Sequence, residues 1–141
     1  MAAFITTKRV RFQHCDPAGI VFYPQYFLIV NEVVEDWFDG PLGVDWRKLH
    51  LDDHLGIPVK KTAAEFFAPS TMGDVLDCVL TVDRVGGSSL ALTIRLTCND
   101  QLRAEFKHLL VQMSTRAMKA VPFPEALRAR IAAFAAEPPR Q

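Results

Sequence analysis

A long run of apolar residues with helical spacing, residues 25–39, most constrains what this chain can fold into. Polar residues recur along one narrow face, at offsets of seven, eleven and fourteen from Gln25, and they are Gln25, Glu32, Asp36 and Asp39. Apolar side chains fill most of the remaining circumference: Tyr26, Phe27, Ile29, Val30, Val33, Val34, Trp37 and Phe38. So broad an apolar surface predicts a helix that is buried on several sides, as if a sheet wrapped around it.

Breaks in the chain bound this helix on both sides. A first strand is expected over residues 5–12, and the Pro-Ala-Gly sequence at 17–19 ends it. Pro24 suits the first helical position, because its missing N–H is not needed there. The GPLG sequence at 40–43 ends the helix, and residues 45–53 are expected to form a shorter one.

After Gly56 the apolar residues alternate with polar ones, which is the period of β-strands. The alternation is clearest over residues 90–98, and the dipeptide Gly86-Gly87 before it predicts a tight hairpin. Other strands are expected over residues 57–67, 76–82 and 102–114, and a last amphipathic helix from Pro124 would place Leu127, Ile131 and Phe134 on one face. A strand, a long buried helix and then at least four strands in a meander predict an α+β fold with an antiparallel sheet.

Composition favours a single domain over residues 1–141. Half of the residues are hydrophobic and 23% are charged, which argues against disorder. The 16 basic residues balance the 16 acidic ones, so no electrostatic argument favours nucleic acid or an anionic membrane as a partner. No apolar run approaches the roughly 20 residues that span a bilayer, and the N-terminus lacks the order of a signal peptide.

The cysteines indicate the compartment. Three of them, an odd number without metal-ligand spacing, are typical of free thiols in a reducing environment, so a cytoplasmic location is expected.

One helix cannot cover both faces and both edges of the expected antiparallel sheet. The leftover apolar surface therefore predicts a homo-oligomer, in which a site at the helix start would lie against a neighbouring subunit.

The segment FQHCDPAGIVFYPQYF, residues 12–27, holds the strongest candidate site. Asp16 precedes a turn and a group of aromatic residues at the helix start. Unpaired N–H groups at a helix N-terminus, such as that of Tyr23, can stabilise a developing oxyanion. Together the two suit acyl transfer, with Asp16 as nucleophile or general base. Alternatively, Asp16 only caps a turn, because Asp before Pro is common in turns.

Other reactive residues have simpler structural interpretations. Cys15 adjoins His14, but consecutive side chains point in different directions, so a packed thiol is favoured over a nucleophile. His108 lies on an apolar strand face and is expected to be a hydrogen-bonded core histidine. His50 and His54 have the spacing of metal ligands on a helix, yet nothing completes a ligand set, so no metal is expected.

Two further features bear on phosphate binding. The Gly-Gly-Ser-Ser sequence at 86–89 resembles a phosphate-binding loop only in composition, and a hairpin explains it better. Several basic side chains could each meet the phosphates of a ligand, but a solvated surface is the ordinary explanation for any one of them: Lys60, Lys61, Arg84, Arg116 and Lys119.

The run CDPAGIVFYPQYF, which follows a short strand and opens a long helix, resembles the active-site segment of the 4-hydroxybenzoyl-CoA thioesterase family. GIPVKKTAAEFFAPSTMGDVL and the Gly-Ser hairpin after it resemble the second strand of that family and the start of its third. The resemblance implies the hotdog fold, in which a curled antiparallel sheet wraps one long central helix. It also implies a homodimer or homotetramer with sites between subunits, an acyl-CoA substrate, and no cofactor.

The resemblance also implies roles for individual residues. Asp16 would match the catalytic aspartate, and Tyr23 the residue whose backbone N–H polarises the thioester carbonyl. Gly19 and Pro24 would shape the loop and the helix start. Further candidate substrate contacts are the aromatic residues Phe22, Tyr23, Tyr26 and Phe27, which would line a slot for the acyl group, and Ser89 in the Gly-Ser hairpin.

Departures from the family concern the substrate more than the chemistry. Many relatives carry a histidine where this chain has Pro24, so a histidine-assisted mechanism is not expected at that position. The variant with proline resembles the 4-hydroxybenzoyl-CoA enzyme itself. That enzyme has an aspartate for the ring hydroxyl where this chain has Asn31, and an arginine-rich turn where this chain reads Val85-Gly86-Gly87.

The expected activity is hydrolysis of an aromatic or short-chain acyl-CoA. A non-catalytic acyl-CoA-binding or scaffold protein is one alternative, although a pure binder gains little from a carboxylate beside an apolar ligand. A hotdog hydratase or dehydratase is the other. Such enzymes pair a histidine with the acid, and the helix segment supplies no histidine after His14.

Overall fold

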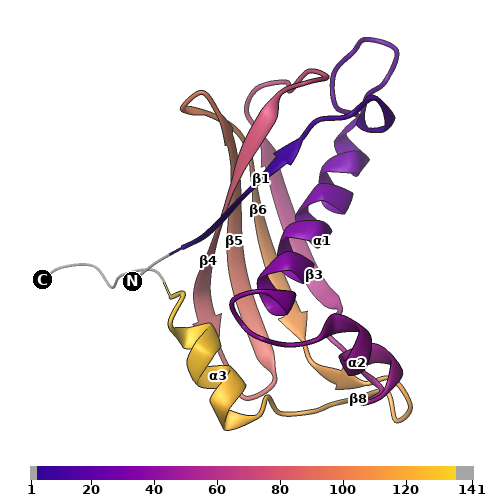
Figure 1. The fold of residues 1–141 in the computed structure, drawn as a ribbon, viewed down its shortest axis with the longest axis vertical. Helices are drawn as coiled ribbons and strands as arrows, with labels where there is room; N and C mark the ends of the chain where they lie inside the picture. The colour runs from indigo at the N-terminus through magenta and orange to yellow at the C-terminus, as the bar shows by residue number, and fades with distance from the viewer. Residues whose placement is uncertain (1–2, 136–141) are drawn as a thin grey trace, which may run out of the picture.

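The computed structural model describes residues 3–135, and in it a five-stranded antiparallel sheet curves around one long helix (Figure 1). The sheet has the order β1-β4-β5-β6-β3, and its strands are β1 (Phe4–Arg9), β3 (Val59–Phe66), β4 (Val75–Val85), β5 (Ser89–Cys98) and β6 (Gln101–Val111). Helix α1 (Tyr23–Asp39) lies along one face of this sheet. The α+β fold with a sheet around a central helix is therefore confirmed.

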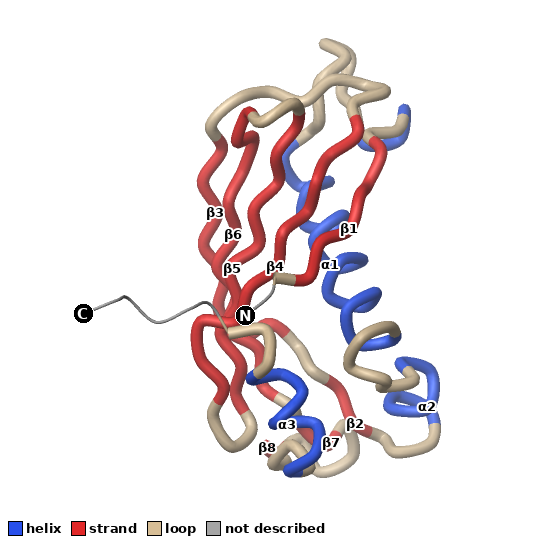
Figure 2. Tube along the Cα trace, turned by 60° about the vertical axis from the view of Figure 1, so that its left-hand side comes forward, coloured by secondary structure: helices blue, strands red, loops and turns tan. Residues whose placement is uncertain are grey.

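The smaller elements gather at one end of the sheet, and the segment between β1 and α1 lies at the other end (Figure 2). The gathered elements are α2 (Trp46–Leu51), β2 (Leu55–Gly56), β7 (Met113–Ser114), β8 (Lys119–Ala120) and α3 (Glu125–Ala132). The short helix η1 (Phe12–His14) belongs to the segment at the other end. The strands β2, β7 and β8 form a second small sheet. Among residues 3–135, no helix is long and apolar enough to cross a membrane.

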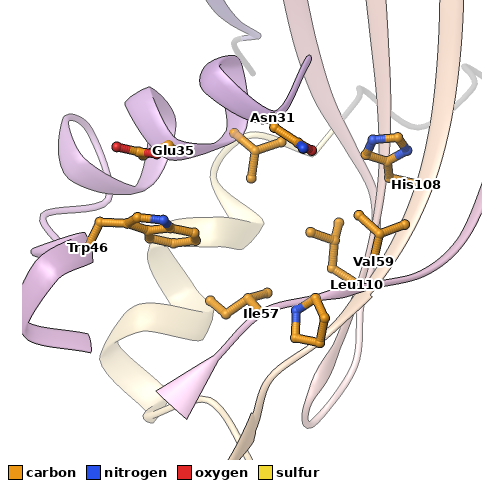
Figure 3. A pocket seen from close by; sticks show the side chains of 9 residues that line it. Asn31, Glu35, Trp46, Ile57, Val59, His108 and Leu110 are labelled. Atoms are coloured by element: carbon orange, nitrogen blue, oxygen red, sulfur yellow. The ribbon is translucent and has the colours of Figure 1, made fainter. Parts of the chain in front are cut away.

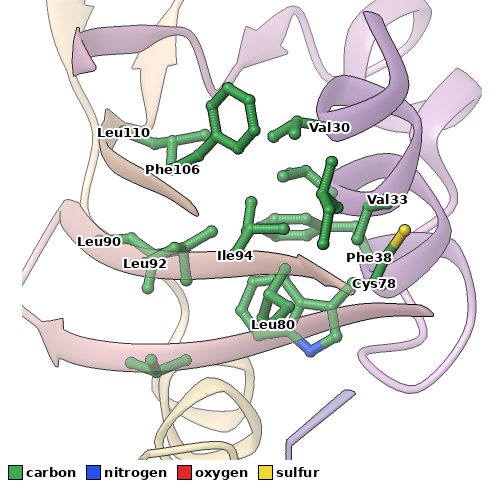
Figure 4. Packing of buried hydrophobic residues seen from close by; sticks show 14 of the residues in the cluster. Val30, Val33, Phe38, Cys78, Leu80, Leu90, Leu92, Ile94, Phe106 and Leu110 are labelled. Carbon is green, nitrogen blue, oxygen red and sulfur yellow. The ribbon is translucent and has the colours of Figure 1, made fainter. Parts of the chain in front are cut away.

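The core lies between α1 and the inner face of the sheet (Figure 4). Alternate residues of β4 and β5 face it, because successive side chains of a strand point to opposite faces. The buried residues of α1 are Tyr26, Ile29, Val30, Val33, Val34, Trp37 and Phe38. Those from the strands include Leu76, Cys78, Leu80, Val82, Leu90, Leu92, Ile94, Leu96, Ala104, Phe106 and Leu110.

Two expected strands end differently in the structure. The strand expected over 5–12 stops at Arg9, because Val10 bonds Asp74 and Gly73 through its backbone and the chain then turns into η1. Phe12, beyond the end of the strand, is 81% exposed. The strand expected over 102–114 is divided at Gln112, whose buried amide donates to the carbonyls of Val121 and Pro122.

Helix and turn positions follow the expectations with small shifts. Helix α1 begins at Tyr23, so Pro24 is its second residue, and α2 is shorter than the expected 45–53. The strand expected over 57–67 is β3, bounded at Val59 and Phe66. Gly86 and Gly87 join β4 to β5 as predicted, and α3 ends before Phe134.

Strand β3 is an edge of the sheet and is open to solvent. It pairs only with β6, and seven of its eight residues are exposed while the other is half-buried. Its outer row of N–H and C=O groups is therefore available for pairing.

Candidate active site

A tight loop between η1 and α1 carries Asp16. The Asp16 N–H donates to the Ile20 carbonyl at 3.0 Å, and the Gly19 N–H donates to the Asp16 carbonyl at 2.9 Å. Gly19 has φ +80°, a conformation that favours glycine. Its expected role in shaping this loop therefore has a direct conformational reason.

The half-buried Asp16 carboxylate caps this turn with one oxygen. Its Oδ1 accepts a hydrogen bond from the Ala18 N–H at 2.8 Å. Within residues 3–135, Oδ2 has no hydrogen-bond partner. The turn-capping interpretation is thus correct for one of the two carboxylate oxygens.

The start of α1 presents one unpaired backbone donor. The N-cap residue Phe22 provides no side-chain hydrogen bond, and Pro24 has no N–H. The Gln25 N–H donates to the Phe22 carbonyl at 2.8 Å. In the described part of the chain, the N–H of Tyr23 is therefore the unsatisfied donor of this turn, at the positive end of the helix dipole.

An apolar hollow of about 280 Å³ adjoins the loop and the helix start. It is lined by Ile20, Val21, Tyr23, Tyr26, Phe66, Phe67, Ala68 and Pro69. Asp16 does not line the hollow, but its backbone N–H is hydrogen-bonded to the carbonyl of Ile20, which does. The structure thus brings Tyr23 and Tyr26 together in the lining of one hollow.

Two other aromatic residues of the segment do not line this hollow. Phe22 is 49% exposed and contacts Tyr23 edge to face, with ring centroids 5.6 Å apart. Phe27 packs on Phe106 in the core, with centroids 5.3 Å apart. The rings that surround Asp16 in the sequence are therefore divided between hollow, surface and core.

A second cavity, of about 420 Å³, lies further along α1 (Figure 3). It is lined by Asn31, Val34, Glu35, Trp46, Ile57, Pro58, Val59, His108 and Leu110. Asn31 follows Tyr23 by eight residues, or about 12 Å along the helix axis. Because Val59 and Phe66 are the two ends of β3, the cavity and the hollow lie at opposite ends of the space between α1 and that strand.

His108 borders this second cavity as a buried, hydrogen-bonded residue. It is 3% exposed, and its Nδ1 lies 2.9 Å from the Thr62 hydroxyl oxygen. Burial lowers the pKa of His108, so the imidazole is neutral at physiological pH. The expected core histidine is confirmed. That it and Trp46 border a cavity was missed, because the sequence does not reveal which residues face α1.

Ser89 lies far from the loop. It pairs with Val111 at one end of β5. The hollow lies near the other end of β5, because Phe67, which lines the hollow, donates its N–H to the carbonyl of Arg103 on the neighbouring strand β6. The ten residues of β5 separate the two ends by about 30 Å. Within one chain, Ser89 and Asp16 therefore do not share a cavity.

The histidines and cysteines outside the site have local structural roles. His50 Nδ1 lies 2.7 Å from the Trp46 carbonyl oxygen, and the described residues contain no group of three or more His, Cys, Asp or Glu positioned for a metal. Cys78 and Cys98 are buried, and burial raises the pKa of Cys78 to about 12. Cys15 is half-buried, with its Sγ 3.5 Å from the Arg11 carbonyl oxygen.

Comparison with known proteins matches residues 10–131 to the thioesterase-like superfamily. A 1,4-dihydroxy-2-naphthoyl-CoA hydrolase of Thermosynechococcus vestitus is 29% identical over 125 residues, which cover 86% of this chain and 84% of the relative. The enzyme of the same name from Nostoc punctiforme is 22% identical over 122 residues, covering 85% and 82%.

Solved structures have the same fold. A gentisyl-coenzyme A thioesterase superposes with a TM-score of 0.80 at 25% identity, covering 89% of this chain and 98% of the other. A 1,4-dihydroxy-2-naphthoyl-CoA thioesterase from Synechocystis superposes with a TM-score of 0.83 at 21% identity, covering 92% and 96%. The second similarity concerns the fold alone.

Proposed function

The chain belongs to the thioesterase-like superfamily, has the hotdog fold and is a thioester hydrolase, and on that premise we propose that it hydrolyses an aromatic acyl-CoA to the free acid and CoA. Two kinds of relative support the aromatic class, since one is named for a dihydroxynaphthoyl-CoA and the other for gentisyl-CoA. Only the class of acyl group is carried over to this chain.

The observation that supports the mechanism is that one carboxylate oxygen and one backbone N–H, both without a partner among the described residues, occur in the same segment. Asp16, in the connection between η1 and α1, and Tyr23, the first residue of α1, are seven residues apart. The Tyr23 N–H would donate to the thioester carbonyl oxygen and stabilise the negative charge that develops on it. Such an arrangement would correspond to that of the 4-hydroxybenzoyl-CoA thioesterase family, whose active-site segment residues 15–27 resemble.

Asp16 would supply the nucleophilic step. Its carboxylate either attacks the carbonyl carbon or takes a proton from the attacking water. In both routes the tetrahedral intermediate collapses by breaking the carbon–sulfur bond, and the CoA thiolate leaves and is protonated. In the first route, water then hydrolyses the acyl-Asp16 anhydride and restores the carboxylate.

The acyl group would lie between α1 and β3. From a thioester at the helix start, the ring extends toward the cavity that holds Asn31 and Trp46. The Asn31 amide can both donate and accept a hydrogen bond, which suits a ring hydroxyl. Gly19 and Pro24 would contribute by setting the course of the backbone around Asp16.

A second subunit would complete the site. Tyr23, Phe66 and Phe67 are 59%, 45% and 50% exposed around the hollow, and the neighbouring strand β3 has an unpaired edge. A homodimer or homotetramer formed through this region would cover those rings and shield the thioester from water.

Thiol release from a panel of aromatic and aliphatic acyl-CoA esters tests the proposal. Asp16→Asn keeps the side-chain shape and is expected to lower kcat by about 10²- to 10⁴-fold with little loss of fold. Asp77→Asn, at an exposed carboxylate on β4, is the matched control and should keep the wild-type rate.

Two outcomes would contradict the proposal. An Asp16→Asn enzyme with most of its rate would remove Asp16 from the mechanism. A folded wild-type protein that binds the esters but releases no thiol would instead indicate a non-catalytic acyl-CoA-binding protein.

A further inference from the structure

A buried polar cluster lies behind the loop that carries Asp16. The Tyr26 hydroxyl donates to Ser70 Oγ at 3.0 Å, and Arg103 Nη1 donates to the same oxygen at 3.2 Å. Arg103 Nη1 also donates to the Pro69 carbonyl at 3.0 Å and to Asp74 Oδ2 at 2.8 Å. Tyr26, Ser70 and Arg103 are 4%, 0% and 9% exposed, so the cluster is shielded from solvent.

Arg103 reaches this position because it is the extra residue of a β-bulge. The pairing of β5 with β6 runs from Leu96–Ala104 to Thr97–Leu102, which leaves Arg103 without an opposite residue. A bulge can turn a side chain away from the direction that regular alternation would give it. Here two adjacent residues of β6, Arg103 and Ala104, are both buried.

The charge of Arg103 is balanced within the cluster. The Thr71 N–H, followed by the Arg103 guanidinium, holds the pKa of Asp74 below its usual range, so the ion pair persists at neutral pH. Arg103 Nε has no hydrogen-bond partner among residues 3–135. A buried arginine with an unsatisfied nitrogen stabilises a fold weakly, whereas its bonds to Ser70 and Asp74 define a specific geometry.

The segment that Arg103 holds is paired with the Asp16 loop. The Val21 N–H donates to the Ser70 carbonyl at 2.9 Å, and Ile20 forms a β-bridge with Thr71. The other end of the cluster, Tyr26, lies in the first turn of α1, three residues after Tyr23. The cluster therefore connects the loop of the carboxylate to the helix start of the oxyanion donor.

We propose that the Tyr26–Ser70–Arg103 cluster is a positioning device that sets the distance between the Asp16 carboxylate and the Tyr23 N–H. This inference rests on the proposed function of those two groups. Tyr26, Ser70 and Arg103 do not react with the substrate; they hold two parts of the site that no other side-chain hydrogen bond of the described residues joins.

Tyr26→Phe is the sharpest test, because it removes the hydroxyl and leaves the ring that packs on Phe66 and Phe106. We expect kcat to fall about 10- to 100-fold with KM nearly unchanged, since misplacing a catalytic group by about 1 Å has an effect of that order. Ser70→Ala should have the same effect, and the double variant should be no worse than either single one.

The role of Arg103 is tested by comparing a substitution that keeps its positive charge with one that removes it. Arg103→Lys keeps the positive charge beside Asp74 and should retain part of the rate, whereas Arg103→Gln should lose as much as Tyr26→Phe. Thr93→Val is the control. It deletes a hydroxyl that donates to Asp83 at 2.6 Å on β5, away from the loop, and should leave kcat unchanged.

Amide hydrogen exchange provides a readout that needs no activity. In Tyr26→Phe, the amides of Val21 and Phe22 should exchange faster, while those within β5 keep the wild-type rate. If wild type releases no thiol from any ester, the proposed function fails, and exchange alone still decides the positioning role. The inference would be overturned if the Tyr26→Phe variant had the same kcat and amide exchange rates as the wild type. It would also be overturned if amide exchange in the variant became faster throughout the molecule.

Discussion

At the N-terminus of α1, the proposed mechanism depends on a single backbone atom group. A helix leaves its first N–H groups without partners, and side chains at the N-cap usually satisfy one of them. Here Phe22 at the N-cap has no polar side-chain atom, and Pro24 removes a further donor. Among residues 3–135 this leaves the N–H of Tyr23 without a partner, and because it belongs to the backbone it does not depend on the tyrosine side chain.

Replacing Tyr23 by proline deletes this N–H while preserving the helix. Proline is favoured at the first helical position, and the preceding Phe22 is extended, with ψ 123°, as a residue before proline requires. We expect Tyr23→Pro to lower kcat by about 10²- to 10³-fold, the effect of losing one oxyanion donor.

Tyr23→Ala is the matched control, because it removes the ring and keeps the N–H. It should retain most of the wild-type kcat. If Tyr23→Pro folds, as judged by circular dichroism, and turns over as fast as Tyr23→Ala, the oxyanion donor must be another group.

At the scale of the elements, α1 and the sheet stabilise each other through one continuous apolar contact. Leu80 on β4 is fully buried, whereas Ile5 on the neighbouring strand β1 is 62% exposed. Leu80→Ala should therefore lower the free energy of unfolding by about 2 to 5 kcal/mol, through lost burial and the cavity left behind.

Urea denaturation of both variants measures the difference. Ile5→Ala, which removes apolar atoms from the outer side of the same sheet, should change stability by less than about 0.5 kcal/mol. Equal losses in the two variants would mean that the outer side is covered as well, and the assignment of the core to one face would be wrong.

For the whole molecule, the open edge strand β3 predicts self-association. If a second copy pairs there, the amides of residues 59–66 should exchange more slowly as protein concentration rises. The amides of β5, which is paired on both sides, should show no concentration dependence. Sedimentation as a monomer at all concentrations would contradict the interface and leave the hollow beside Tyr23 uncovered.

Local patterns predicted the elements well because they record local causes. Alternation over 90–98, the apolar helix surface and the turn residues each reflect short-range geometry, and β5, α1 and the hairpins follow them. Element ends were less predictable, since β1 stops where Val10 bonds the distant residues Gly73 and Asp74.

The sequence by itself determined the α+β class, the central helix, and Asp16 and the Tyr23 N–H as neighbours in one segment. Only the tertiary structure decided what surrounds them. Ser70 and Arg103 are 33 residues apart, and Arg103 turns inward only because β5 and β6 pair with a bulge. Contacts of this kind depend on strand register, which arises from the packing of the whole sheet on α1 and leaves no local signal in the chain.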